Sequence, residues 1–119
     1  MTATLGAITL DCADPQALAE FYRQATGWEL VHSSDDYAYL AGDGPIRLGF
    51  QRIAGHPRPS WPDDGKQFHL DFGVASIPEA EAALLALGAS KPEFQPGGDM
   101  AVVLTDPAGH PFCITDASW

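Results

Sequence analysis

The stretch "LGAITLDCADPQALAEFYRQATG" (5–27) decides the fold, because it joins a strand pattern to a helix pattern. Its first part alternates between apolar and small or polar side chains, as in a strand with one buried face. A helix should then begin after Asp14, with Pro15 in its first turn and Gly27 as its terminator. The same order returns in "FHLDFGVASIPEAEAALLALG" (68–88). The chain is therefore predicted to contain two copies of one structural unit.

Three further strand-like runs follow each strand–helix pair. The predicted strands are 28–33, 37–42 and 45–53 in the first copy, and 91–96, 100–106 and 111–116 in the second. A polar, proline-rich connecting loop, 54–66, separates the copies. The prediction is one α+β domain over 1–119, built from two βαβββ modules (1–53 and 67–119) whose curved mixed sheets enclose a cleft.

Composition narrows the class of partner. The chain has 119 residues and a net charge of -10, with 16 acidic against 6 basic residues. That balance argues against nucleic acid and against anionic membranes, which both need clusters of Lys and Arg. No apolar run is long enough to span a membrane and no signal peptide is recognisable. With only Cys12 and Cys113 as cysteines, we expect reduced thiols and a cytoplasmic protein.

One strand carries a chemically distinctive face. Apolar residues occupy every second position of 68–74, and His69 and Asp71 stand between them. Each helix must bury its apolar stripe on its own sheet, so Ile8 and Leu10 should lie beneath the first helix. His69 and Asp71 should then lie on the uncovered face. Two such semi-polar faces predict a cleft that binds a small molecule.

The segments "DPQALAEFYRQATGWEL", "HLDFGV…EAEAALLALGA" and "DPAGHPFCI" resemble the vicinal oxygen chelate superfamily, which contains glyoxalases, bleomycin-resistance proteins and extradiol dioxygenases. The resemblance covers the whole chain. The stretch "SWP…FHLDF" is similar to a glyoxalase-like subgroup common in actinobacteria. The family implies the two-module fold, a homodimer and a ligand cleft. Because the same fold serves metal enzymes and metal-free drug binders, the resemblance leaves the activity open.

The resemblance also implies where a metal would bind. In the metal enzymes the ligands come from the first and last strands of each module, which places them here at Ala7, Arg47, His69 and Cys113. Among these four only His69 is a ligand of the family type, and Cys113 stands where the enzymes have a glutamate. We therefore expect no cofactor and no metal site of the family kind, although a divalent metal remains an alternative.

His69 is the candidate catalytic residue, since an imidazole titrates near neutral pH. It could act as a base or hydrogen-bond donor in the pocket, or bind a metal with Asp71 and Cys113, or be structural. Gln51 is a weak third partner for that metal. Residues i and i+2 of a strand lie roughly 6.5–7 Å apart, so direct bonding between His69 and Asp71 should be strained. A cross-strand residue such as Arg47 is the alternative partner of Asp71.

Arg47 and Cys113 each admit two interpretations. The planar guanidinium of Arg47 could bind a carboxylate or phosphate, or it could pair with an acidic neighbour. Cys113 could be a reactive thiolate beside Arg47 or His69, or a small buried apolar residue. Trp61 is expected to act as a lid over the cleft, or as a dimer contact.

The sequence therefore favours a protein that binds a small organic molecule and sequesters or recognises an antibiotic or metabolite. The predicted ligand contacts are Arg47, Gln51, Asp71, Cys113, Tyr37, Tyr39, Phe50 and Trp61. The rival is a lyase, isomerase or dioxygenase-type enzyme that uses His69 as base or as ligand of an irregular metal site. A third reading is a regulatory module whose partner contacts the Trp61 loop.

Overall fold

A computed structural model describes residues 5–62 and 69–116 of the chain. The chain divides into two compact units, 1–57 and 58–119. The boundary falls inside the predicted connecting segment, 54–66. No helix in the described ranges is both long and apolar enough to cross a membrane.

Unit 1 has the predicted order of one strand, one helix and three strands. Its elements are β1 (Ala7–Cys12), α1 (Pro15–Thr26), β2 (Glu29–Ser33), β3 (Tyr37–Ala41) and β4 (Arg47–Arg52). The sheet order is β1-β4-β3-β2, with β1 parallel to β4 and the other pairs antiparallel. The caps are as predicted: the Asp14 side chain accepts from the N–H of Ala17, and Gly27 closes the helix at a φ of 74°.

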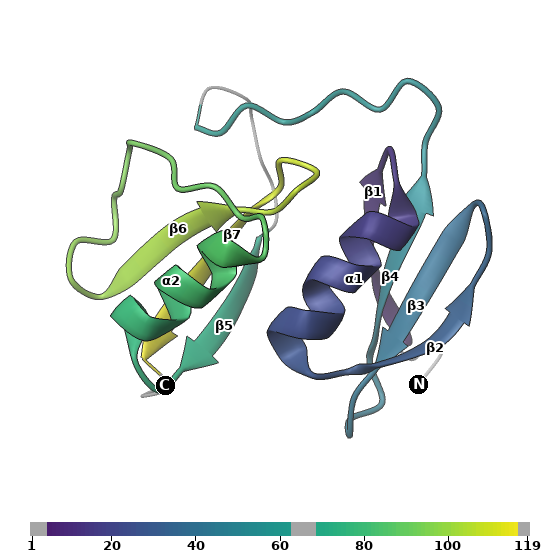
Figure 1. Ribbon diagram of the computed structural model, residues 1–119, viewed down its shortest axis with the longest axis horizontal. Coiled ribbons are helices and arrows are strands. Elements are labelled where there is room, and N and C mark those ends of the chain that lie inside the picture. Colours follow the sequence, from purple (N-terminus) through teal and green to yellow (C-terminus); the bar gives the residue numbers. More distant parts are fainter. Residues whose placement is uncertain (1–4, 63–68, 117–119) are drawn as a thin grey trace. The chain divides into compact units, whose positions relative to one another are not determined.

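The core of unit 1 lies between α1 and the middle of the sheet (Figure 1). Tyr22 of α1 stacks on Phe50 of β4 with ring centroids 5.5 Å apart, and both side chains are buried. Ile8 lies on the predicted, helix-facing side of the sheet, beside Leu48 in the β1–β4 pairing, but the helix covers it only in part, since Ile8 is 42% exposed. The physical reason is that β1 is an edge strand, whereas α1 packs mainly over β3 and β4.

Unit 2 repeats the strand–helix order. Its elements are β5 (Leu70–Val74), α2 (Ile77–Ala86), β6 (Ala101–Thr105) and β7 (Pro111–Asp116). The sheet order is β5-β7-β6, with β5 parallel to β7 and β6 antiparallel to it. The helix covers one face of this sheet (Figure 1), and Leu84, Leu104, Phe112 and Ile114 form the core there. The α+β class is therefore confirmed, with sheets of four and three strands.

The predicted strand at 91–96 does not form, so the described part of unit 2 has three strands rather than four. Pro92 and Pro96 supply no backbone N–H for a ladder. The Gln95 side chain takes the place of a strand backbone: its amide nitrogen donates to the carbonyl of Val103, and its amide oxygen accepts from the Val103 N–H, both at 2.9 Å. One side chain thus supplies hydrogen-bond partners for both backbone groups of Val103 on the edge of β6.

The turn between β6 and β7 depends on a buried acid. Asp106 is 0% exposed, and its Oδ1 accepts from the N–H groups of Ala108 at 2.9 Å and His110 at 3.0 Å. Its own N–H donates to the His110 carbonyl. This carboxylate therefore fixes the bend that starts β7, the strand carrying Cys113.

Candidate functional site

Unit 2 brings three chemically competent side chains together on one sheet face. In the parallel pairing of β5 with β7, Asp71 lies opposite Cys113. His69 stands just before β5, two residues from Asp71, and so points to the same side. Ligand atoms of His69, Asp71 and Cys113 all lie within 4.8 Å of one another. Strand register and strand periodicity are sufficient to explain the cluster.

His69 and Asp71 approach each other without a short hydrogen bond. His69 Nε2 lies 3.4 Å from Asp71 Oδ1, which is within ion-pair range but longer than a typical charged hydrogen bond. The two side chains lean toward each other along the strand, so they meet although their Cα atoms are further apart. They remain 38% and 53% exposed, respectively, and the pair is ionic only when the imidazole is protonated.

A pocket of about 270 Å³ adjoins the cluster, and His69 and Cys113 form its polar end. Its remaining walls are mostly apolar: Trp61, Pro96, Gly97, Ala101, Val103 and Pro111. Val103 lies opposite Cys113 in the antiparallel pairing of β6 with β7. This volume is near the lower limit for small-molecule sites, and the lining is of the usual kind, apolar with few polar groups. We call this space the His69 pocket.

Trp61 belongs to the connecting segment, 54–66, and its side chain lines the His69 pocket. Its ring lies 5.5 Å from that of Phe94, at an interplanar angle of 35°. The predicted lid residue is thus beside His69, within unit 2. Sequence reasoning misses Phe94 as its support, because Phe94 falls within the predicted strand 91–96.

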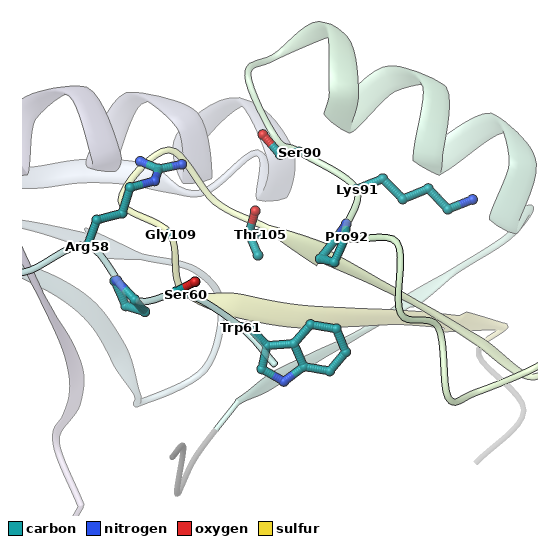
Figure 2. A pocket seen from close by; sticks show the side chains of 9 residues that line it. Arg58, Ser60, Trp61, Ser90, Lys91, Pro92, Thr105 and Gly109 are labelled. Atoms are coloured by element: carbon teal, nitrogen blue, oxygen red, sulfur yellow. The ribbon is translucent and has the colours of Figure 1, made fainter. Parts of the chain in front are cut away.

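A second pocket, of about 240 Å³, also has Trp61 in its lining (Figure 2). It contains two of the chain's few cations, Arg58 and Lys91, but both have acceptors already. Arg58 Nη1 donates to the carbonyl of Pro107 at 2.6 Å, and Lys91 Nζ lies 3.0 Å from Glu81 Oε1. Figure 2 shows the Lys91 side chain extending away from Trp61. Because both cations already have acceptors, this pocket is not an open anion site.

Unit 1 carries four of the predicted contacts on one sheet face. Tyr37 lies opposite Gln51 and Tyr39 opposite Gly49 in the β3–β4 pairing, and Arg47 lies at the other end of β4. The Tyr39 ring covers Gly49 so closely that an added Cβ would stand 2.5 Å from it. The Tyr37 and Tyr39 rings meet edge to face at 5.9 Å. This face is a polar and aromatic surface of unit 1, and its part in binding stays a prediction.

Phe50 does not belong to that face. It is 0% exposed and stacks on Tyr22 beneath α1. Residues alternate along β4, so Phe50 points to the helix while Arg47, Gly49 and Gln51 point away from it. Its predicted role as an aromatic wall is therefore revised to that of a core residue.

The donors present fit the metal site of the superfamily only in part. At the two expected positions of unit 1, Ala7 and Arg47 lie side by side in the β1–β4 pairing, and neither offers a ligand atom. Unit 2 offers an imidazole, a carboxylate and a thiol, a set that suits a borderline ion such as Zn²⁺. The residue types at Ala7 and Arg47 therefore do not fit the four-ligand site that the resemblance implies, whereas a three-residue site within unit 2 is chemically feasible.

Comparison with known proteins agrees with this fold. Residues 7–115 match the model of the glyoxalase-like domain, so the chain belongs to that family and to the vicinal oxygen chelate superfamily. No functionally curated protein is significantly similar in sequence.

Solved structures share the fold at low sequence identity. A glyoxalase/bleomycin resistance protein/dioxygenase family enzyme from Burkholderia phytofirmans PsJN is 22% identical, with a TM-score of 0.75 over 96% of this chain and 98% of that one. The fosfomycin resistance protein FosX from Listeria monocytogenes, solved with Mn(II), is 19% identical, with a TM-score of 0.72 over 99% and 95%. A lactoylglutathione lyase from Agrobacterium tumefaciens is 22% identical, with a TM-score of 0.64 over 98% and 95%. At these identities the likeness describes the fold alone.

Proposed function

We propose that this chain binds a small organic molecule in the His69 pocket and sequesters or recognises it, without the metal site of its superfamily. The observation that carries the proposal is an apolar pocket with a single polar end, formed by His69 and Cys113. Such a lining matches a ligand with an apolar body and one polar group. An antibiotic or metabolite of that kind is the expected ligand class.

Each side chain has a distinct part in this proposal. His69 donates to or accepts from the polar group of the ligand, and Asp71 orients the imidazole from 3.4 Å away. Trp61, supported by Phe94, covers the apolar body. The aromatic and basic face of unit 1, with Tyr37, Tyr39, Arg47 and Gln51, is a second candidate binding surface.

A second candidate function has its own support in the cluster of His69, Asp71 and Cys113. If these residues hold a divalent ion, the protein would be an enzyme of the lyase, isomerase or dioxygenase type. The ion would supply a Lewis acid at the polar end of the pocket. The residues of the chain would bind and orient the substrate beside it.

Resemblance to the family further supports a homodimer and membership of the actinobacterial glyoxalase-like subgroup. The sequence has only two cysteines, Cys12 and Cys113, and this usage favours a reducing compartment such as the cytoplasm.

Thermal-shift screening with pocket variants tests the binding proposal. A true ligand at about 100 times its Kd should stabilise the wild type by about 2.7 kcal/mol, and so raise Tm. Ala101→Leu narrows the pocket and should abolish this rise. Ala82→Leu is a matched control on the exposed surface of α2 and should keep it. If the ligand raises the Tm of both Ala101→Leu and His69→Ala as much as that of the wild type, binding in this pocket is contradicted.

A further inference from the structure

We propose that Cys113 is a nucleophile that captures a small electrophilic ligand covalently, with His69 as the group that accepts the thiol proton. The inference rests on the proposed binding in the His69 pocket and deepens it by naming the ligand class. The ligand class is an α,β-unsaturated carbonyl compound whose apolar part fits the pocket.

The first support is the position of the thiol. Cys113 lies on β7, lines the pocket and is partly exposed, so a ligand in the pocket can reach its Sγ. Cys12 provides the contrast within the same chain. It is 1% exposed in unit 1, and its thiol lies 3.5 Å from the Gln51 carbonyl. Of the two thiols, only Cys113 combines access to a cavity with a base nearby.

The second support is the arrangement of the base. A ring nitrogen of His69 lies within 4.8 Å of the Cys113 thiol, a distance that one water molecule or a small rotation can bridge. Asp71 Oδ1 lies 3.4 Å from His69 Nε2, so the carboxylate can orient the imidazole and stabilise it once it carries the proton. Nucleophile, base and a third group that orients the base are the recurring parts of a thiol centre. Asp71 is the positioning residue in this set.

The reaction balances without any further reagent. The Sγ of Cys113 forms a bond to the β-carbon of the enone or enal as the thiol proton passes to His69. The π electrons move to the carbonyl oxygen as an enolate. The proton then returns from His69 to the α-carbon, which leaves a saturated thioether adduct and a neutral imidazole. No leaving group, oxidant or reductant is needed, and the apolar walls disfavour competing water.

Intact-protein mass spectrometry with methyl vinyl ketone tests the proposal, with EDTA present so that no bound metal masks the thiol. The wild type should gain one adduct, which peptide mapping places on Cys113. It should form at least about 100-fold faster than the adduct of N-acetylcysteine under the same conditions. Cys12→Ala should react like the wild type, and Cys113→Ser should not react. An adduct rate equal to that of N-acetylcysteine would overturn the proposal.

Variants of the partner residues separate the chemistry from a loss of folding. His69→Gln should return the rate to about that of the model thiol, while Cys12 stays unmodified because the core is intact. Asp71→Ala should slow the reaction, and Asp71→Asn, which keeps an acceptor beside the imidazole, should recover part of the rate. A wild-type rate in His69→Gln would overturn the role of His69.

The saturated analogue butan-2-one keeps the two proposals distinguishable. If it, or a screened ligand, raises Tm in the wild type but not in Ala101→Leu, binding in the pocket stands. If in that case methyl vinyl ketone forms no adduct at Cys113, the covalent step alone is wrong.

Discussion

Replacing Asp106 by alanine is expected to lower the free energy of unfolding by about 2–4 kcal/mol. The carboxylate is buried and accepts two backbone N–H groups, from Ala108 and His110. Alanine would leave both N–H groups without this acceptor, and a partly buried donor without a partner costs about 1–3 kcal/mol. Urea unfolding of the full chain, followed by circular dichroism, measures the loss.

Asp106→Asn is the matched control for this prediction. It keeps an oxygen that can accept the same two N–H groups, so the loss should be about half or less of that in Asp106→Ala. An Asp106→Ala protein as stable as the wild type would show that the turn between β6 and β7 does not depend on the carboxylate.

Replacing Gln95 by alanine should lower stability by about 2 kcal/mol. The side chain bonds both backbone groups of Val103, a residue that is 5% exposed, and also donates to the carbonyl of Pro92 at 2.8 Å. Loss of the Gln95 side chain should also make the neighbouring Pro96 and Gly97, which line the His69 pocket, more mobile. Hydrogen exchange of the Val103 amide should become markedly faster, because that N–H loses its acceptor.

Gln24→Ala serves as the control, because Gln24 bonds only to the exposed Glu20 on the surface of α1 among the contacts described. Its effect should stay within about 0.5 kcal/mol. Here Arg23 and Gln24 donate to the Glu20 carboxyl and lower its pKa to about 2. Equal effects of Gln95→Ala and Gln24→Ala would contradict the strand-like role of Gln95.

Much of the fold was accessible from sequence because its signals are local. Asp14 and Gly27 cap a helix by their own chemistry, and period-two alternation marks β5 and β4. The strand prediction for 91–96 was wrong because prolines interrupt the backbone hydrogen bonds there, and the Gln95 side chain replaces the missing bonds. The Gln95 side chain can replace a strand backbone only because Val103 lies beside it in space. The alternation of side chains along the sequence gives no information about that neighbour.

The candidate site was accessible only in part. His69, Asp71 and Cys113 could be assigned to one face from strand periodicity, but the 3.4 Å contact of His69 with Asp71 depends on side-chain direction. Phe50 was assigned to a ligand wall although its own strand places it beneath α1. The second pocket escaped prediction because it is formed by loop residues around Trp61 and by the Ser90–Thr105 bridge, which have no shared sequence pattern.

The metal content of the purified protein tests the central claim most directly. The protein is prepared without chelator or affinity tag, and elemental mass spectrometry is run on the wild type and on His69→Ala. A metal-free binding pocket predicts less than about 0.1 metal ion per chain in both proteins. About one Zn, Mn, Fe or Ni per wild-type chain, lost in His69→Ala, would contradict the claim and make the cluster of His69, Asp71 and Cys113 a metal centre.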